Sequence, residues 1–272
     1  HKKRAAGEAV GTTGHQWDED LAEYNNPLPK WWMWLFWITI VFGLVYLALY
    51  PGLGAFKGIL GWSSTGQYQA EQASADTTYG PVFRKYAAMD IEAIAKDPKA
   101  KAMGERLFLT YCSQCHGSDA RGAKGFPNLA DNDWLWGGAP ENILTTILEG
   151  RTGNMPPMGA AVGGPEGVKE VASYVLSLSG AAHDAKLAEA GKAKFAACAA
   201  CHGPEAKGNP ALGAPNLTDG IWLHGGSLAA ISEQIDKGRV NVMPAHREFL
   251  GPERSRILAA YVWGLSQGAG AK

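Results

Sequence analysis

Two short cysteine and histidine motifs carry the chemistry that this sequence suggests most directly. Together they contain all four cysteines of the chain, and they consist of Cys112, Cys115 and His116 in the first motif and Cys198, Cys201 and His202 in the second. In C-x-x-C-H, two thiols on one turn of helix can each form a thioether with a haem vinyl group, which leaves the histidine under the iron as proximal ligand. The motifs therefore predict two covalently bound haems c.

Paired cysteines also occur in redox-active dithiols, in zinc sites and in short disulfides. A zinc site built from four thiolates would not need a histidine after each pair. The chain has only four cysteines and seven histidines, so two complete C-x-x-C-H matches favour haem attachment over these alternatives.

The two motifs belong to a longer repeat. The segment Pro127–Gly138 matches Pro215–Gly226 without a gap. Shorter matches continue the repeat, namely Gly150-Arg151 with Gly238-Arg239, Met155-Pro156 with Met243-Pro244, and Tyr174-Val175 with Tyr261-Val262. Two copies of one module explain this pattern best.

The sixth iron ligand must come from a side chain with a free lone pair. The repeated Met-Pro pair nominates Met155 and Met243, because a thioether stabilises Fe(II) and the proline fixes the backbone beside it. Two competitors lie three residues further on, Met158 in the first copy and His246 in the second. Ligation by His246 would make the second haem bis-histidine, but the residue that both copies share is the methionine.

Other residues of the repeat are candidates for contacts with the haem edge. Arg151 and Arg239 could pair with haem propionates, since a guanidinium matches a carboxylate with two hydrogen bonds; ordinary surface arginines are the alternative. We expect Trp134 and Trp222 to pack against haem or propionates. His183 and His224 resemble loop residues, and the first-copy counterpart of His224 is Trp136, which cannot ligate iron.

Each copy has the helix order of a class I cytochrome c. A helix leads into C-x-x-C-H, and a Gly/Pro-rich segment follows. Amphipathic helices come next, and we predict them over residues 141–149 in the first copy and 228–237 in the second. A final helix, over 169–179 or 252–266, is expected to pack across the first. The predicted domains are 104–180 and 181–272, and haem supplies apolar mass that such small modules lack.

One stretch is long and apolar enough to cross a membrane. From Trp31 to Tyr50 the chain runs for twenty residues without a charge, which spans about 30 Å of hydrocarbon. Pro29 and Pro51 bracket the stretch, and aromatic residues lie near both ends, where they prefer the interface. We predict a transmembrane helix over residues 30–51, so the fold class is mainly α, with one transmembrane helix before two tandem class I cytochrome c domains.

Flanking cations predict the orientation of this helix. Four precede it and only Lys57 follows it closely, the four being Lys2, Lys3, Arg4 and Lys30. The positive-inside rule then places an N-terminal segment, 1–29, in the cytoplasm. Covalent haem attachment agrees, because bacterial c-type cytochromes mature on the outer face of the cytoplasmic membrane. We expect a spacer, 52–103, and both haem domains in the periplasm of a bacterial inner-membrane protein.

The remaining segments carry no assigned chemistry. Residues 1–26 are polar and are expected to form a solvated segment or a short amphipathic helix, with His1 and His15 as surface residues. A helical stretch from about Gln67 to Met103, interrupted at Gly80-Pro81 and at Asp97-Pro98, could be a stalk or a docking surface. The chain does not begin with methionine, so we expect residues upstream. Its formal net charge of −1 gives nucleic-acid binding no electrostatic support.

The whole chain resembles the dihaem cytochrome c subunit (CcoP, also called FixP) of cbb(3)-type cytochrome c oxidase. Besides the anchor and the two modules, four segments match that family's pattern: Tyr24–Trp32, Leu49–Gly54, Tyr79–Phe83 and Lys85–Met89. Some members carry an additional membrane helix that would precede His1. The resemblance implies proximal ligation by His116 and His202 and distal ligation by Met155 and Met243. It also implies an exchange of methionines between modules, but spacing does not decide this, so the ligands are left unpaired.

The resemblance implies electron transfer rather than catalysis by this chain. Electrons would come from a soluble or membrane-bound cytochrome c and pass to the monohaem cytochrome c subunit, which feeds the catalytic haem-copper subunit. One alternative is a stand-alone, membrane-tethered electron shuttle. A dihaem peroxidase is the enzyme alternative, but it needs an open iron position, and both copies keep Met-Pro.

Overall fold

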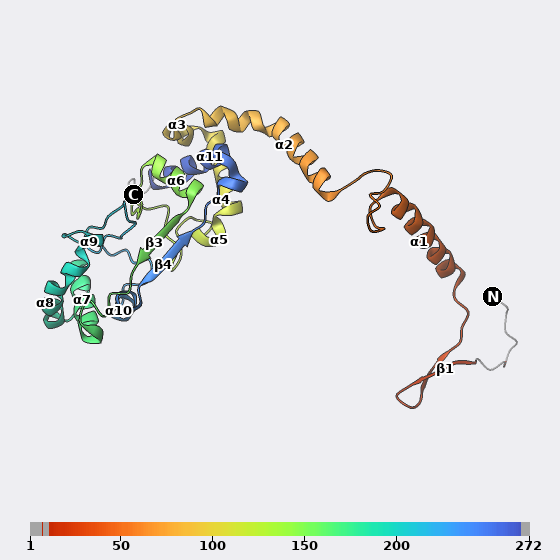
Figure 1. The fold of residues 1–272 in the computed structure, drawn as a ribbon, viewed down its shortest axis with the longest axis horizontal. Helices are drawn as coiled ribbons and strands as arrows, with labels where there is room; N and C mark the ends of the chain where they lie inside the picture. Colours follow the sequence, from red (N-terminus) through yellow and green to blue (C-terminus); the bar gives the residue numbers. More distant parts are fainter. Residues whose placement is uncertain (1–6, 8–10, 268–272) are drawn as a thin grey trace. The chain divides into compact units, whose positions relative to one another are not determined.

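The structure, a computed structural model, describes Gly7 and residues 11–267. It consists mainly of helices and forms two compact units, His1–Thr78 and Tyr79–Lys272 (Figure 1). The mainly helical class predicted from the sequence is confirmed. Four residues used above, His1 and the cations Lys2, Lys3 and Arg4, lie outside the described residues.

The first unit begins with a β-hairpin. Strands β1 (Thr12–Trp17) and β2 (Leu21–Tyr24) pair antiparallel, with Thr12 opposite Tyr24. Asp18 and Glu19 lie in the turn and both adopt positive φ, a conformation that aspartate tolerates better than most residues. The alternative of an amphipathic helix is therefore wrong for these residues, whereas the exposed hairpin agrees with a solvated segment.

Helix α1 (Lys30–Leu49) is the predicted membrane span. Its twenty residues have a mean hydropathy of 2.0 in the most apolar window, and none is buried within the protein. Among the described residues it is the one helix long and apolar enough to cross a membrane. Large apolar side chains that contact no protein core require an apolar environment outside the chain.

Helix α2 (Ser64–Ala87) begins in the first unit and ends in the second. It continues through Pro81, so the predicted interruption at Gly80-Pro81 is wrong. Gly80 has no Cβ to clash with the proline ring, which removes the usual objection to a helical residue before proline. The predicted interruption at Asp97-Pro98 is confirmed, since α3 (Ile91–Lys96) ends there and α4 (Pro98–Tyr111) begins.

The second unit contains the two sequence copies. After α4 come a short helix and one further helix and strand of the first copy, α5 (Ser113–His116), α6 (Pro140–Glu149) and β3 (Arg151–Met155), and then α7 (Gly164–Leu178). The second copy repeats this order with α8 (Ala185–Lys194), the 3-10 turn η1 (Phe195–Ala197), α9 (Ala199–His202), α10 (Leu228–Lys237), β4 (Arg239–Met243) and α11 (Arg247–Gln267). Helix α11 bends at Gly251, so its straight part begins at Pro252, as predicted.

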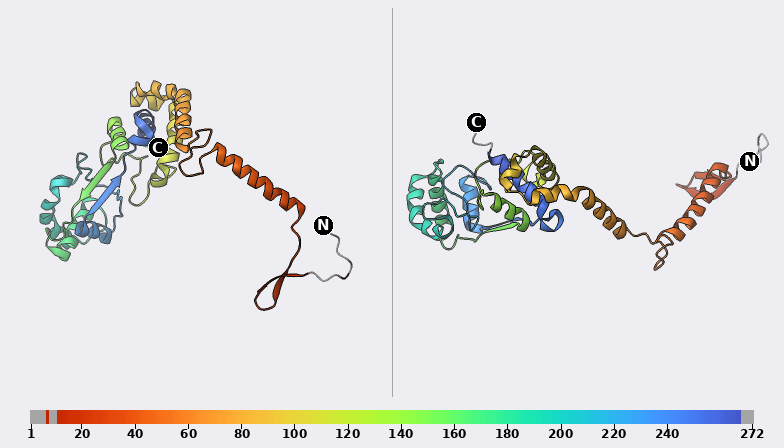
Figure 2. Two further views of the ribbon diagram at one scale, coloured as in Figure 1. Left: turned by 45° about the vertical axis from the view of Figure 1, so that its right-hand side comes forward. Right: turned by 90° about the horizontal axis from the view of Figure 1, so that it is seen from above.

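Two separate hydrophobic cores hold this unit together, and each takes its final helix from the other copy. Helix α11 packs against α3, α4 and α6, whereas α7 packs against α8 and α10. In both views of Figure 2 the blue C-terminal helix accordingly lies with the yellow α4 segment. The prediction that each final helix packs across the first helix of its own copy is wrong. The predicted domains 104–180 and 181–272 describe copies in the sequence, not packing units.

The first core also includes part of the predicted spacer. Tyr86, Ile91 and Ile94 are buried there, together with Phe108 of α4 and Ile257 of α11. The Tyr86 hydroxyl donates to Asp97 Oδ2 at 3.0 Å. Residues assigned to 52–103 therefore form part of the support for the first C-x-x-C-H motif.

Strands β3 and β4 carry the chain from one core to the other. They pair antiparallel over their full length, with Arg151 opposite Met243 and Met155 opposite Arg239 (Figure 1). Each strand starts beside the core of its own copy and ends beside the core of the other. This ribbon is the local cause of the helix exchange.

Candidate haem-binding sites

Each C-x-x-C-H motif follows a capped helix. Asp97 caps α4 by accepting hydrogen bonds from the backbone N–H groups of Lys99, at 2.8 Å, and Ala100. Asp184 caps α8 in the same way, with Lys186 N–H at 2.8 Å. An aspartate at this position satisfies backbone donors that the helix leaves free. Both copies thus use the same local device to fix the helix that precedes the motif.

The two motif histidines are held in an orientation suited to iron ligation. His116 and His202 are each 7% exposed, and each Nδ1 lies 3.0 Å from a backbone carbonyl, that of Pro127 or of Pro215. A carbonyl can only accept, so Nδ1 carries the proton and Nε2 keeps the free lone pair. Burial is the largest effect on the pKa of both histidines and lowers it, which favours the neutral, ligating form.

The carbonyl acceptors were not predicted from the sequence. The signal was nevertheless present, because Pro127 and Pro215 open the ungapped match between the two copies. The repeat therefore preserves the acceptor as well as the histidine.

The cysteines do not have the properties of a redox-active pair. None of the four forms a disulfide, and Cys112 and Cys198 are half-buried whereas Cys115 and Cys201 are exposed. Burial raises the pKa of Cys112 to about 11 and also raises that of Cys198. Reactive dithiols need a lowered thiol pKa, so the structure gives the redox alternative no support.

A zinc site also lacks support. Within residues 11–267 and Gly7, no three His, Cys, Asp or Glu side chains gather in an arrangement that could hold a metal ion. Haem ligation needs only one histidine and one further ligand from the protein for each iron. The residues present therefore fit haem better than a metal ion bound by the protein alone.

The exchange brings each methionine to the other copy's core. Met155 packs against the second core, as do Cys198 and Trp222. Gly150 ends α6 of the first copy, and a Cβ there would collide with the backbone carbonyl of Met243. Gly238 ends α10, and a Cβ there would collide with the backbone carbonyl of Met155. Met243 therefore lies at the first core, and Met155 at the second.

These two glycines have a conformation that other residues rarely adopt. Gly150 has φ 70° and ψ −176°, and Gly238 has φ 68° and ψ −177°. This region is essentially restricted to glycine. The absence of a side chain thus permits both the sharp exit from the helix and the close approach of the methionine strand.

His246, the alternative ligand in the second copy, also lies beside the first copy. Its backbone N–H donates to Ile147 O at 3.0 Å, and its charge lowers the pKa of His116. The equivalent N–H of Met158 donates to Ile235 O at 2.8 Å. His246 lies near the first motif, so its position does not support the alternative, already disfavoured by the repeat, that it ligates the second haem.

The two arginines lie in equivalent places but have different neighbours. Arg151 Nε donates to Thr146 Oγ1 at 2.9 Å, and its guanidinium lies 4.9 Å from the ring centroid of Trp136. Arg239 Nε is buried without a hydrogen-bond partner. Trp134 packs against the first core and Trp222 against the second. The buried, unpartnered Nε of Arg239 fits a site completed by an acceptor such as a haem propionate.

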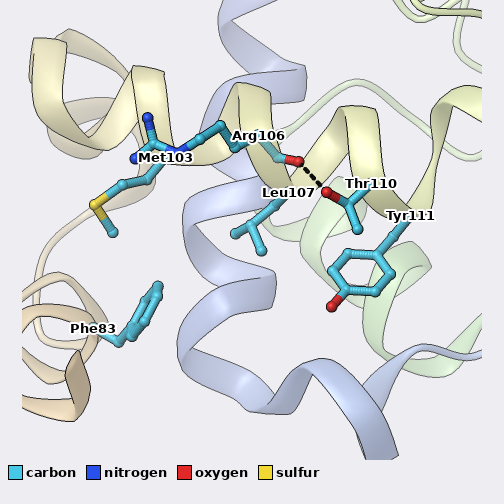
Figure 3. Close-up of a pocket in the computed structure, with 6 residues that line it drawn as sticks. All are labelled: Phe83, Met103, Arg106, Leu107, Thr110 and Tyr111. Atoms are coloured by element: carbon cyan, nitrogen blue, oxygen red, sulfur yellow. Dashed lines mark hydrogen bonds between the residues drawn. The ribbon is translucent and has the colours of Figure 1, made fainter. Parts of the chain in front are cut away.

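A surface pocket of about 190 Å³ lies on the outer face of α4 (Figure 3). Phe83 from α2 closes one side, and α4 supplies the rest of the lining, which includes Arg106 and Tyr111. The Thr110 hydroxyl donates to Arg106 O at 2.7 Å, so its hydrogen-bond donor is used within the helix. None of the predicted iron ligands lines this pocket.

These geometries define a class of protein, the c-type cytochromes: helical modules in which C-x-x-C-H presents an oriented histidine to haem. Comparison with known families agrees. Residues 9–57 match the family model described as the N-terminal domain of cytochrome oxidase-cbb3, FixP. Residues 99–175 and 186–262 match cytochrome c oxidase, cbb3-type, subunit III.

Individual relatives cover nearly the whole chain. The cbb3-type cytochrome c oxidase subunit CcoP of Rubrivivax gelatinosus is 60% identical over 256 residues, which is 94% of this chain and 84% of that protein. The subunit FixP of Sinorhizobium medicae (strain WSM419) is 41% identical over 286 residues, 98% of each chain. The chain belongs to the CcoP/FixP family of cbb3-type cytochrome c oxidase subunits. It is a haem c protein of the electron-transfer type, and the resemblance seen in the sequence is confirmed.

Proposed function

We propose that this chain is the membrane-anchored dihaem subunit that relays electrons into a cbb3-type oxidase. It receives electrons from a soluble or membrane-bound cytochrome c and passes them to the monohaem cytochrome c subunit, which serves the catalytic haem-copper subunit. The chain itself catalyses no oxygen chemistry. The observation that carries the proposal is the pair of motif histidines, each oriented by a carbonyl, together with a Met-Pro strand from the other copy at the end of each copy's core helix.

The proposed iron ligands follow from the exchange. Cys112 and Cys115 bind one haem, ligated by His116 and Met243, and Cys198 and Cys201 bind the other, ligated by His202 and Met155. Two side-chain ligands at each iron leave no open position for peroxide or oxygen. The haem supplies a reversible one-electron couple when bound, and methionine with histidine gives it a higher potential than two histidines would.

We further propose the location. Helix α1 anchors the chain in the bacterial inner membrane, with the N-terminal segment in the cytoplasm and both haem modules in the periplasm. The uncharged stretch Trp31–Tyr50 supports the anchor, and the excess of cations before it supports the orientation.

The ligand assignment can be tested in a chain that keeps a single attachment motif. In the Cys198→Ala/Cys201→Ala protein, the one remaining haem should become high-spin when Met243→Ala is added, and should stay low-spin with Met155→Ala. Met103→Ala on α4 serves as a control methionine. Ligation within each copy would give the reverse result.

The assignment to an oxidase can be tested by purification in mild detergent. The full chain should carry the mass of two haems and copurify with b-type haem and copper. Migration as a free small protein would favour the stand-alone shuttle. A strong high-spin ferric spectrum with rapid peroxide turnover would favour the peroxidase and contradict the proposed ligation.

A further inference from the structure

His224 and Trp136 occupy equivalent positions in the two copies, and both lie where one copy contacts the other. Trp136 packs against Gly213, in the loop after the second motif. His224 lies over Gly125, in the loop after the first motif, with Nδ1 3.9 Å from the position of a Cβ there. The Gly125 N–H donates to Leu223 O at 2.8 Å and fixes this contact. The two copies thus place a histidine and a tryptophan in matching environments.

The histidine has an unfilled hydrogen-bonding position. In the described part of the chain, four buried side-chain polar atoms lack a hydrogen-bond partner: Ser173 Oγ, His224 Nε2, Arg239 Nε and Ser255 Oγ. Two of the four belong to residues that interact, since Asn241, two residues after Arg239 on the same strand, hydrogen-bonds to His224 and the charge of Arg239 acts on it. A buried polar atom without a partner costs about 1–3 kcal/mol. Two such atoms on interacting residues fit a bound group that completes both.

The charges around these atoms favour an anion. The groups that act on His224 are Arg239, Lys124 from the first copy's loop, and the Asn241 side chain, which hydrogen-bonds to the imidazole and leaves Nε2 without a partner. Glu233 on α10 interacts with Arg239 and Lys124, but its hydrogen bond is with Lys237. A carboxylate would therefore meet the two unpartnered nitrogens in a region of excess positive charge.

We propose that His224 and Arg239 together bind a propionate carboxylate of the haem attached at Cys198 and Cys201. Arg239 begins β4, directly after α10, whose Ile231 and Ile235 belong to the second core. In the first copy Trp136 replaces the histidine, and Arg151 stacks on that ring. The two haems then differ in their propionate sites although their proposed iron ligands are alike. This inference rests on the proposed dihaem function.

The histidine gives the second site a proton-exchanging group that the first lacks. Burial and then Arg239 lower the pKa of His224, whereas the negative carboxylate raises it. When one electron arrives from a donor cytochrome c, the charge of the site falls by one, and His224 takes up one proton from solvent. When the electron leaves for the next carrier, His224 releases that proton to solvent.

The test is a potentiometric titration of the complete dihaem protein at several pH values between about 5.5 and 8.5, the range around the ordinary histidine pKa. One of the two haem potentials should fall as pH rises, and the other should stay constant. Full coupling of one proton to one electron corresponds to about 59 mV per pH unit, because tenfold in an equilibrium constant is 59 mV for a one-electron couple. Partial coupling gives a smaller slope.

Matched variants assign the slope to His224. His224→Gln keeps a hydrogen-bonding side chain but does not titrate, so it should flatten the slope while both haems remain bound. His224→Trp copies the first module and should do the same. His183→Gln, at an exposed histidine, should leave the slope unchanged. In Met155→His, which should lower the potential of the second haem, the slope should belong to the lowered component.

Several results would overturn the inference. These are two pH-independent potentials in the unmodified protein, a slope that survives His224→Gln, or a slope that belongs to the component left unchanged by Met155→His. A protein whose mass shows fewer than two haems would instead contradict the proposed dihaem function, so the two failures are distinguishable.

Discussion

The exchange of final helices makes a prediction about which parts of the protein a core substitution destabilises. Leu258 on α11 is 0% exposed and Leu176 on α7 is 4% exposed. Each lies in a different core, and both can be shortened to alanine. Leu→Ala at a buried site costs about 2–5 kcal/mol. Leu258→Ala should weaken the first core by that amount, and Leu176→Ala should weaken the second.

Hydrogen exchange followed by mass spectrometry measures this separately for each helix. In Leu258→Ala the amides of α4 and α6 should open about 30-fold to a few thousand-fold more often, since about 1.4 kcal/mol corresponds to tenfold. The amides of α8 and α10 should change much less. Leu176→Ala is the chemically matched control and should give the opposite distribution.

The reasoning would be refuted by the reverse pattern. If Leu258→Ala loosened α8 and α10 while α4 and α6 kept their protection, each final helix would pack within its own copy. Met243 would then have no structural reason to approach His116.

Three further predictions concern single sites. Gly150→Ala should lower the free energy of unfolding by about 1–3 kcal/mol, because Gly150 has positive φ and lies close to the Met243 carbonyl. In thermal unfolding it should destabilise the protein more than Gly180→Ala, where φ is also positive but no atom lies near the added Cβ. Equal effects would argue against the close approach of the Met243 carbonyl. The pKa of Asp133 is raised by burial and then by Asp219 and Asp131, so the stability of the folded state falls as pH rises through that raised value. In denaturant titrations Asp133→Asn should therefore be more stable than the unmodified protein at neutral pH, by less than about 1 kcal/mol, and equally stable below the usual carboxyl pKa of 3.8; a stabilisation that persisted in acid would contradict this cause. Cys198→Ala/Cys201→Ala should remove the mass of one haem and weaken amide protection in α8 and α10 more than in α4; uniform loss would show that the two cores unfold as one.

The site residues could be predicted because their signals are local. C-x-x-C-H and Met-Pro are contained in a few neighbouring residues, and their repetition removed most chance explanations. The helices at 141–149 and 228–237 were also predictable from their amphipathic pattern, and the structure places α6 and α10 there. The packing partner of a helix is not a local property.

The exchange could not be derived from the repeat, because the two arrangements satisfy the sequence equally well. Val171 on α7 and Leu258 on α11 are both apolar and both fully buried, so either helix could fill either core by pattern alone. Which helix fills which core depends on the path of the five residues Arg151–Met155. They can turn back to the core of their own copy or cross to the core of the other copy. Likewise, the role proposed for His224 could not be predicted, because the residues around it come from both copies.

The paired strands β3 and β4 also bear on how such a chain can be divided. A cut in the exposed link between α7 and α8 would leave two fragments, each with its own attachment motif and each missing the final helix that completes the core around that motif. The fragments would stay associated through the β3–β4 pairing and the exchanged helices, as in a domain-swapped dimer. A single-copy ancestor could have formed the same structure as a domain-swapped dimer of two identical chains. Gene duplication and fusion would then have joined two subunits that already exchanged their final helices.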